Sequence, residues 1–437
     1  MGDFPDGFQF GLATSAYQIE GAAALDGRTP SVWDTFCRKP GTIADGSTGD
    51  VACDHYHRWA EDVALMADLG VDAYRLSVCW SRVQPDAGGA PNEKGLDFYS
   101  RLVDALLESA IQPVVTLFHW DLPQWVQDAG GWRRRDTADR FAEYAAVVAA
   151  RLGDRVGTWS TINELFEHFA LGHLTGEHAP GLTLGLADGL GVAHHLLLAH
   201  GRAVQVLRGE VDAPIMGITS YAPAVPSADG DHTAAQFYDV LQNRLFTEPI
   251  LQGTYPDEVA ALLAPFTRDR DLELIAAPLD YWGVNYYSVN AVRAVDRPIP
   301  LEVVAPAGYH LTDSGWAVSP SGLTDVLVGL RERYGEKLPP LVVSETGCAY
   351  ADTIDATGQC HDPDRVTFLA AHIDAMTTAI RAGVDIRGFY VWSLLDNFEW
   401  AQGYTRRFGL VHVDFSTGRR TPKSSFTWYQ SLIDTRS

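Results

Sequence analysis

Apolar runs of strand length recur along the chain and alternate with longer segments of helical periodicity. The eight runs are FQFGLATS from residue 8, VDAYRLSVCW from 71, PVVTLFHW from 113, TWSTINE from 158, PIMGITSY from 214, YWGVNYYS from 281, LVVSE from 341 and IRGFYVWSLL from 386. Several are apolar almost throughout, which is typical of strands buried on both faces of a parallel sheet.

The segments between these runs predict helices over residues 57–70, 136–153 and 362–383, among others. The last begins with Asp362-Pro363, which suits an N-cap and a first turn, and ends on Gly383. Eight strands alternating with helices predict a closed (β/α)8 barrel, with an open doubly wound sheet as the alternative. No linker, repeat or low-complexity tract divides the chain, so we expect one domain spanning residues 1–437.

Composition narrows the partners and the compartment. The chain has 437 residues and a formal net charge of −23, which argues against nucleic acid and anionic membranes as partners. No run approaches the roughly 20 apolar residues that span a bilayer, and the N-terminus lacks a signal-peptide pattern. Five cysteines without a CxxC pair indicate reduced thiols. We expect a cytoplasmic protein, and self-association into a homo-oligomer stays open.

Polar and aromatic side chains follow nearly every predicted strand. Barrel enzymes carry their chemistry at this edge, where strands deliver residues into loops. Polar loops alone would explain one or two such residues, but they explain the whole set poorly. The set comprises Gln18, Glu20, His119, Trp120, Asn163, Glu164, Asn285, Tyr287, Glu345, Trp392, Asp396, Glu399 and Trp400.

Two of these carboxylates, Glu164 and Glu345, follow the fourth and seventh strands, and barrel closure would turn both toward the axis. Paired carboxylates with amides and aromatic rings match the hydrolysis of a glycosidic bond. Amides and acids bind sugar hydroxyls, and tryptophan covers the apolar face of the ring. This chemistry requires no metal and no cofactor.

Six segments together resemble glycoside hydrolase family 1, the β-glucosidase family. They are FQFGLATSAYQIEGA (8–22), FHWDLPQW (118–125), TINE (161–164), GVNYYS (283–288), SETG (344–347) and VWSLLDNFEWAQGYTRRFGLVHVD (391–414). The resemblance covers essentially the whole chain in the family's order. It implies a retaining exo-β-glycosidase, with Glu345 as nucleophile and Glu164 as acid/base about 5–5.5 Å apart. The charge of Glu345 should keep Glu164 protonated until Glu345 is esterified.

The resemblance also implies roles for the surrounding residues. Arg75 and Tyr287 would support the nucleophile. The substrate-binding residues would be Gln18, His119, Trp120, Asn163, Asn285, Tyr287, Trp316, Trp392, Glu399 and Trp400. The expected substrates are β-glucosides or short β-linked oligosaccharides, with side activity on β-fucosides and β-galactosides. A β-galactosidase, a β-fucosidase or a transglycosidase of the same family is the alternative.

The chain departs from the family pattern at Leu165, where proline is usual, and at Thr346, where asparagine is usual. Neither change removes a reacting atom. Glu164 argues against thioglucosidases, which carry glutamine there. Glu399 argues against 6-phospho-glycosidases, because a carboxylate would repel a sugar phosphate.

Two other classes compete with this interpretation. A metal-dependent barrel hydrolase would use the cluster Asp54, His55 and His57, but this stretch leads directly into a helical pattern rather than ending a strand. A solvated or helix-capping role fits it better. A non-catalytic sugar-binding barrel would have lost one of the two carboxylates, and both are present.

Overall fold

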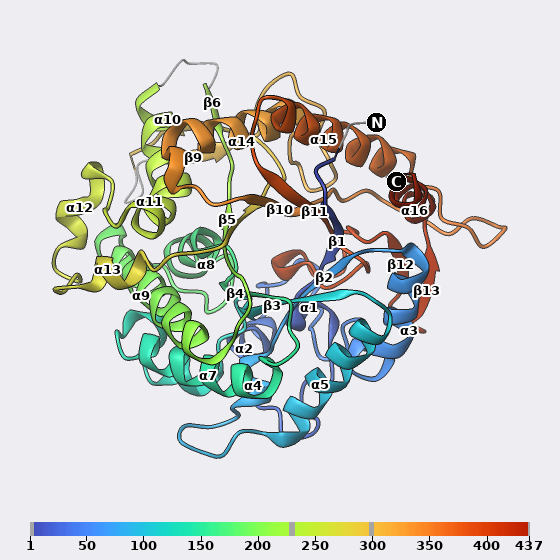
Figure 1. Cartoon of the computed structure of the whole chain (residues 1–437), viewed down its shortest axis with the longest axis horizontal. Coiled ribbons are helices and arrows are strands. Elements are labelled where there is room, and N and C mark those ends of the chain that lie inside the picture. Colours follow the sequence, from blue (N-terminus) through green and yellow to red (C-terminus); the bar gives the residue numbers. More distant parts are fainter. Residues whose placement is uncertain (1–3, 227–231, 297–300, 436–437) are drawn as a thin grey trace.

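Eight parallel strands close into a barrel at the centre of the molecule (Figure 1). The computed structural model describes residues 4–226, 232–296 and 301–435. Neighbours around the barrel follow the order β1-β11-β10-β7-β5-β4-β3-β2. The strands are β1 (Gln9–Ala13), β2 (Ala73–Ser77), β3 (Gln112–Phe118), β4 (Thr158–Ile162), β5 (Ile215–Ser220), β7 (Tyr281–Asn285), β10 (Leu341–Thr346) and β11 (Ile386–Trp392).

All eight predicted strands are present, and the barrel rather than the open sheet is confirmed. The strands are mostly shorter than the apolar runs. The fourth run extends to Glu164, for example, whereas β4 ends at Ile162. The Asn163 backbone amide still donates to the Phe118 carbonyl oxygen at 2.9 Å before the chain turns into α8, so the polar residues lie just beyond the strand end.

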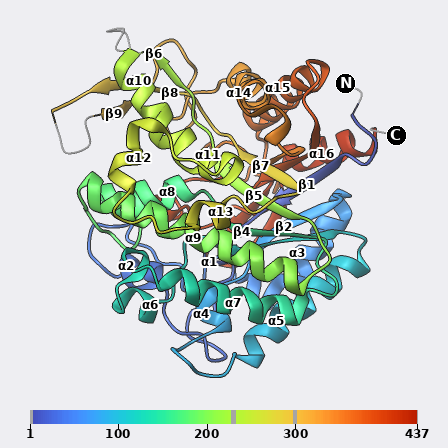
Figure 2. The same ribbon diagram turned by 60° about the vertical axis from the view of Figure 1, so that its left-hand side comes forward.

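Helices surround the barrel as an outer ring (Figures 1 and 2). Long helices following the strands are α3 (His55–Leu69), α5 (Glu93–Glu108), α7 (Thr137–Leu152), α9 (Leu186–Glu210), α14 (Pro320–Tyr334), α15 (Pro363–Arg381) and α16 (Ser424–Asp434). A group of shorter helices follows β5: α10 (His232–Asp239), α11 (Leu245–Gln252), α12 (Asp257–Leu263) and α13 (Asp271–Ile275). The three predicted helices correspond to α3, α7 and α15, and Pro363 is the first residue of α15 as expected.

The loops carry further short elements. The helices among them are α1 (Ala16–Ile19), α2 (Val32–Cys37), α4 (Trp80–Val83), α6 (Gln124–Asp128) and α8 (Leu165–Phe169). Two π-helical turns are η2 (Ala170–Thr175) and η3 (Val240–Arg244), and short 3-10 turns are η1 (Gly131–Arg133), η4 (Gly335–Lys337) and η5 (Trp400–Gln402). Outside the barrel, β6 (Ala224–Pro226), β8 (Asn290–Ala294) and β9 (Leu301–Val304) form a small sheet, and β12 (Val411–Asp414) pairs with β13 (Arg419–Pro422).

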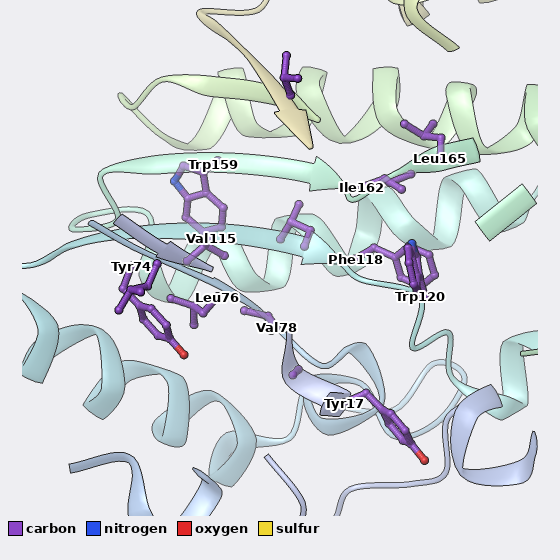
Figure 3. Packing of buried hydrophobic residues seen from close by; sticks show 14 of the residues in the cluster. Tyr17, Tyr74, Leu76, Val78, Val115, Phe118, Trp120, Trp159, Ile162 and Leu165 are labelled. Carbon is purple, nitrogen blue, oxygen red and sulfur yellow. The ribbon is translucent and has the colours of Figure 1, made fainter. Parts of the chain in front are cut away.

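Alternate residues of the strands pack into two separate layers. Tyr74, Leu76, Val115 and Trp159 belong to the large apolar cluster between strands and helices (Figure 3). The strand residues that lie between these positions form a smaller cluster. It consists of Ala73, Val114, Met216, Ile218, Val342 and Tyr390. Successive side chains of a strand point to opposite faces, so this smaller cluster fills the barrel interior. Arg75 lies two residues after Ala73 on β2, so it points to the same face of the strand, and it is fully buried.

The C-terminal helix covers the strand pair at which the chain closes on itself. β1 pairs with β11 from Gln9–Gly388 to Ala13–Trp392. The Tyr429 hydroxyl of α16 donates to the carbonyl oxygens of Gly11 and Phe389 at 3.2 Å each, one on either strand. In the part of the chain that the structure describes, no helix is both long enough and apolar enough to cross a bilayer.

Candidate active site

A cavity of about 1040 Å³ opens at the carboxyl ends of the barrel strands. Both carboxylates singled out from the sequence, Glu164 and Glu345, line it. The other predicted residues on its wall are His119, Trp120, Asn285, Tyr287, Trp316, Trp392, Glu399 and Trp400. Barrel closure therefore brings residues from β3, β4, β7, β10 and β11 into one space.

Glu345 lies near the end of β10, where the strand is irregular. The register of β10 shifts between Val343 and Glu345 relative to β7, and between Val343 and Thr346 relative to β11. Such irregularities re-aim side chains at barrel rims. One Glu345 carboxylate oxygen forms an ion pair with the Arg75 guanidinium. The other accepts a hydrogen bond from the Tyr287 hydroxyl at 2.7 Å.

Glu164 follows β4 directly and takes a left-handed backbone conformation. Its φ is +45°, and α8 begins at the next residue. An L residue in this region costs about 1–2 kcal/mol relative to its right-handed conformation. The side chain is only 5% exposed although it lines the cavity. The backbone turn therefore presents the carboxyl group to the enclosed site.

The Asn163 amide connects the two carboxylates through a directed set of hydrogen bonds. Its Oδ1 accepts from Arg75 Nη2 at 2.7 Å and from Asn285 Nδ2 at 3.1 Å. Its Nδ2 donates to Glu164 Oε2 at 3.2 Å and to His119 Nε2 at 3.0 Å. Because Arg75 can only donate, the amide orientation is fixed. One guanidinium thus orients Glu345 directly and Glu164 through Asn163.

Burial raises the pKa of Glu164 well above its ordinary value, and the negative charges of Glu345 and then Glu167 raise it further. The sequence predicted this direction from the Glu345 charge, whereas burial is the larger cause. A carboxyl group with a raised pKa stays protonated near neutral pH and can act as a general acid. Burial, followed by the Arg75 charge, lowers the pKa of His119, so its ring is neutral.

Glu399 forms a second polar group at the other end of the site. Gln18 Nε2 donates to Glu399 Oε2 at 3.3 Å and to the Phe398 carbonyl oxygen at 2.9 Å. Burial, followed by the charge of Glu345, raises the pKa of Glu399 to about 8. Gln18 is fully buried behind Glu399, and its Oε1 accepts from Ser15 Oγ at 2.6 Å. In this structure Gln18 positions Glu399.

Aromatic rings form two walls of the cavity. On one wall, the His119 ring stacks on Trp392 and Trp400 with centroids 5.8 and 5.9 Å apart, and the Trp120 ring lies 4.7 Å from Trp400. On the other wall, the Trp316 centroid lies 5.4 Å from Tyr287 and 5.8 Å from Phe408. The first wall adjoins Glu399, and the second adjoins Glu345 through Tyr287.

Two acids at strand ends lie outside the cavity wall and make structural ion pairs. Glu20 accepts from Arg82 Nε at 3.0 Å and from the Tyr99 hydroxyl at 2.6 Å. Asp396 is fully buried and pairs with Arg407 and Lys423. Sequence position alone cannot separate these acids from Glu399, because all of them follow barrel strands.

The cavity also includes residues that the sequence analysis did not select. Phe166, Glu167, Ser220, Gln242, His178 and Phe408 all line it. Glu167 could have been found from its spacing, because it lies three residues after Glu164 and a side chain in the first turn of a helix lies near the residue that precedes the helix. Ser220 and Gln242 carry no comparable signal, since tertiary packing of β5 and η3 brings them there.

The two departures from the family pattern both lie in buried positions. Leu165 is the first residue of α8 and packs in the apolar cluster near Ile162 (Figure 3). Proline is well suited to this first helical position, because the N–H there has no partner within the helix. Thr346 ends β10 and is fully buried. Each side chain is therefore enclosed by the protein directly next to one of the two carboxylates.

The cluster weighed as a metal site makes other interactions. His57 Nδ1 lies 2.6 Å from Asp54 Oδ1 on the surface, and His55 Nδ1 lies 2.7 Å from Asp62 Oδ2. His55 is buried, not solvated, and Asp62 also pairs with Arg420. Within the described ranges, no three His, Cys, Asp or Glu side chains are grouped as a metal site requires.

Comparison with known proteins gives a consistent result. The family model described as Glycosyl hydrolase family 1 matches residues 1–437. The chain is 45% identical to a bifunctional beta-D-glucosidase/beta-D-fucosidase of Bifidobacterium breve and 44% identical to beta-glucosidase A of Acetivibrio thermocellus, each over 98% of both chains. The solved structure of a Thermotoga maritima beta-glucosidase in complex with deoxynojirimycin matches all of both chains with a TM-score of 0.95 at 41% identity.

Proposed function

Because the chain belongs to glycosyl hydrolase family 1 and is a glycoside hydrolase, we propose that it removes terminal β-D-glucosyl residues with retention of configuration. The observation that carries this proposal is the arrangement of Glu164 and Glu345 in one cavity around a shared Arg75–Asn163 pair. One carboxyl group is surrounded by donors, and the other has its pKa raised by burial and charge. A retaining glycosidase needs one ionised carboxylate as nucleophile and one protonated carboxyl group as general acid.

In the first step, a carboxylate oxygen of Glu345 attacks the anomeric carbon. The bond to the glycosidic oxygen breaks as Glu164 transfers its proton to that oxygen. The leaving group departs as an alcohol, and an ester joins the sugar to Glu345. Direct attack requires the two carboxyl groups about 5–5.5 Å apart, without room for an intervening water.

In the second step, Glu164 acts as a base, because the negative charge that helped to keep it protonated has disappeared. It accepts a proton from water while the water oxygen attacks the anomeric carbon. The ester bond breaks, Glu345 regains its charge, and the sugar leaves with its original configuration. Arg75 and the Tyr287 hydroxyl would stabilise the returning carboxylate.

The glucosyl ring would lie between Glu399 and the two catalytic carboxyls. Gln18, Glu399, His119, Asn163 and Asn285 would hydrogen-bond its hydroxyls, with Asn163 near the 2-hydroxyl. Trp120, Trp392 and Trp400 would cover its apolar face. Trp316 would contact the leaving group at the entrance. These assignments rest on the family pattern and on the position of each side chain at or behind the cavity wall.

We expect activity on β-fucosides and β-galactosides beside β-glucosides. Glu399 can accept hydrogen bonds from either orientation of the 4-hydroxyl, and a relative is named a beta-D-glucosidase/beta-D-fucosidase. This expectation would be wrong if kcat/KM for the β-fucoside and the β-galactoside fell below about a thousandth of the value for the β-glucoside. That ratio corresponds to a loss of roughly 4 kcal/mol in transition-state binding.

The decisive experiment is trapping with a 2-deoxy-2-fluoro-glucoside of an activated phenol. The intact mass should rise by one glycosyl unit, and peptide mapping should place the label on Glu345. The Glu345→Gln variant should take no label. Glu164→Ala should still be labelled and should lose about 10²–10⁴-fold in turnover of substrates with poor leaving groups. Label on any other residue would overturn the assignment of roles.

A further inference from the structure

A polar network lines the cavity beyond Glu164 and is not used in the steps above. It comprises Glu167 of α8, Ser220 at the end of β5, Tyr238 of α10, Gln242 of η3 and Asn290 at the start of β8. α8 packs against β5 (Figure 1). η3 contacts the same strand. Segments distant in sequence therefore build one continuous wall.

The hydrogen bonds of this wall run in one direction toward Glu167. Asn290 Nδ2 donates to the Tyr238 hydroxyl at 2.7 Å, which donates to Gln242 Oε1 at 3.2 Å. Gln242 Nε2 donates to Ser220 Oγ at 3.2 Å and to Glu167 Oε1 at 3.4 Å. Ser220 Oγ donates to Glu167 Oε1 at 3.1 Å.

These hydrogen bonds hold the Glu167 carboxyl group in place through one of its two oxygens. Glu167 Oε1 receives both donors, whereas Glu167 Oε2 accepts no hydrogen bond from any described residue. Glu167 is half-buried and lines the cavity, so this oxygen faces the enclosed space. Preorganised groups of this kind bind a ligand without the cost of ordering a flexible side chain.

The position of Glu167 relative to Glu164 indicates which part of a substrate it meets. Glu164 directly precedes α8 and Glu167 lies in the first turn of that helix; both line the same cavity, and the Glu167 charge acts on Glu164. Glu164 gives its proton to the glycosidic oxygen, and the leaving group is attached to that oxygen. The nonreducing sugar occupies the Glu399 side, so the leaving group extends toward Glu167.

We propose that Glu167, held by Ser220 and Gln242, binds a hydroxyl of the leaving group and makes the enzyme selective for hydroxylated leaving groups such as a second sugar. This inference rests on the proposed function and names the substrate class for the same site. Glu167 is a specificity-determining residue: it neither attacks the anomeric carbon nor transfers a proton, and its charge is a smaller cause of the raised pKa of Glu164 than burial and Glu345.

The test compares three β-glucosides that separate hydroxyl recognition from acid catalysis. Cellobiose and n-octyl β-glucoside both leave as alcohols and need the Glu164 proton, but only cellobiose has leaving-group hydroxyls. The 4-nitrophenyl β-glucoside needs little protonation and reports glucosidase activity itself. If the wild-type enzyme hydrolyses none of the three, the proposed function fails, independently of Glu167.

In Glu167→Leu, kcat/KM for cellobiose should fall about 10-fold or more, as expected for a lost hydrogen bond to a charged group. The values for the octyl and nitrophenyl glucosides should stay within about 3-fold, because neither meets the carboxylate. Gln242→Leu should shift the cellobiose-to-octyl ratio in the same direction. Glu177→Gln is the matched control, since Glu177 is an exposed carboxylate on the same cavity.

Equal losses on cellobiose and the octyl glucoside would overturn the proposal, because Glu167 would then act through Glu164. An unchanged cellobiose-to-octyl ratio would overturn it as well. Glu167→Gln keeps the shape of the side chain and removes its charge. It gives the same comparison if the leucine variant does not fold, and its ratio should fall in the same direction.

Discussion

At the scale of single residues, the site depends on how Arg75 divides its donors. Its guanidinium reaches Glu345, Asn163 and Thr116 while fully buried. Glu345 therefore lies between the charged Arg75 and the Tyr287 hydroxyl, whereas Glu164 receives hydrogen bonds from the neutral amides of Asn163 and Asn285. Two identical carboxyl groups acquire different environments from the same cation, and acid and nucleophile roles can separate in this way.

The pH dependence of activity tests this difference. A general acid must be protonated, so kcat/KM should fall as pH rises through the raised pKa of Glu164. Removal of the Glu345 charge should lower that pKa, because one of the causes of the shift is lost. Carbon-13 NMR of labelled glutamate should therefore show Glu164 titrating at lower pH in Glu345→Gln than in the wild type.

The same shift should occur in the trapped 2-fluoroglucosyl enzyme, in which Glu345 is an uncharged ester. Glu177→Gln is the control, because it removes an exposed carboxylate and should leave the Glu164 titration in place. An unchanged titration of Glu164 in both the variant and the trapped enzyme would contradict a contribution of the Glu345 charge to its raised pKa.

At the scale of elements, a buried ion network fixes the segment that follows β11 and carries Glu399 and Trp400. Lys423, at the N-terminus of α16, places its Nζ 2.6 Å from Asp352 and 2.7 Å from Asp396. Arg365 of α15 pairs with Asp352 at 2.7 Å and with Asp362 at 2.6 Å. The loops after β10 and β11 are thereby tied to two outer helices.

Replacement of Lys423 by methionine should be strongly destabilising. Asp352 and Asp396 would lose a buried partner, and breaking a buried ion pair costs about 3–5 kcal/mol. The thermal midpoint followed by circular dichroism should fall, and KM should rise because Glu399 and Trp400 lie directly after Asp396. The control is Arg270→Met, which breaks an exposed pair with Glu273 and should leave the midpoint unchanged. Similar midpoints for the two variants would contradict a stabilising role for the network.

At the scale of the whole molecule, the two ends of the chain meet at the seam of the barrel. β1 and β11 pair directly, and α16 packs against α3 and caps the seam through Tyr429. No strand of the barrel has a free edge, so the loss of β1 or β11 would open the sheet. The expectation of a single domain stays a prediction, as do the cytoplasmic location and any self-association.

Equilibrium unfolding tests the single domain. If residues 1–437 form one cooperative unit, urea unfolding followed by far-UV circular dichroism and by tryptophan fluorescence should give coincident transitions. Twelve tryptophans distributed along the chain report most of its length. Two separated transitions, or a stable fragment of half the chain after limited proteolysis, would contradict the prediction.

The sequence by itself determined the strands and the barrel, and it supplied the pair of carboxylates that we propose to react. Strands buried on both faces are apolar almost throughout, so they appear in the sequence as apolar runs. Glu164 and Glu345 stand at the ends of two of these runs. The strand boundaries were less visible, because the runs continue into the loops beyond the last paired residues of most strands. The six family segments supplied the remaining site residues by resemblance.

Tertiary structure alone decided which polar residues share the cavity. Asp396 and Glu399 follow the same strand, yet one is buried among cations and the other faces the site. Gln18 lies behind Glu399, and the network of Glu167, Ser220 and Gln242 is assembled from three elements. Hydrogen-bond direction and burial depend on contacts between distant segments, and no local pattern of residues encodes them.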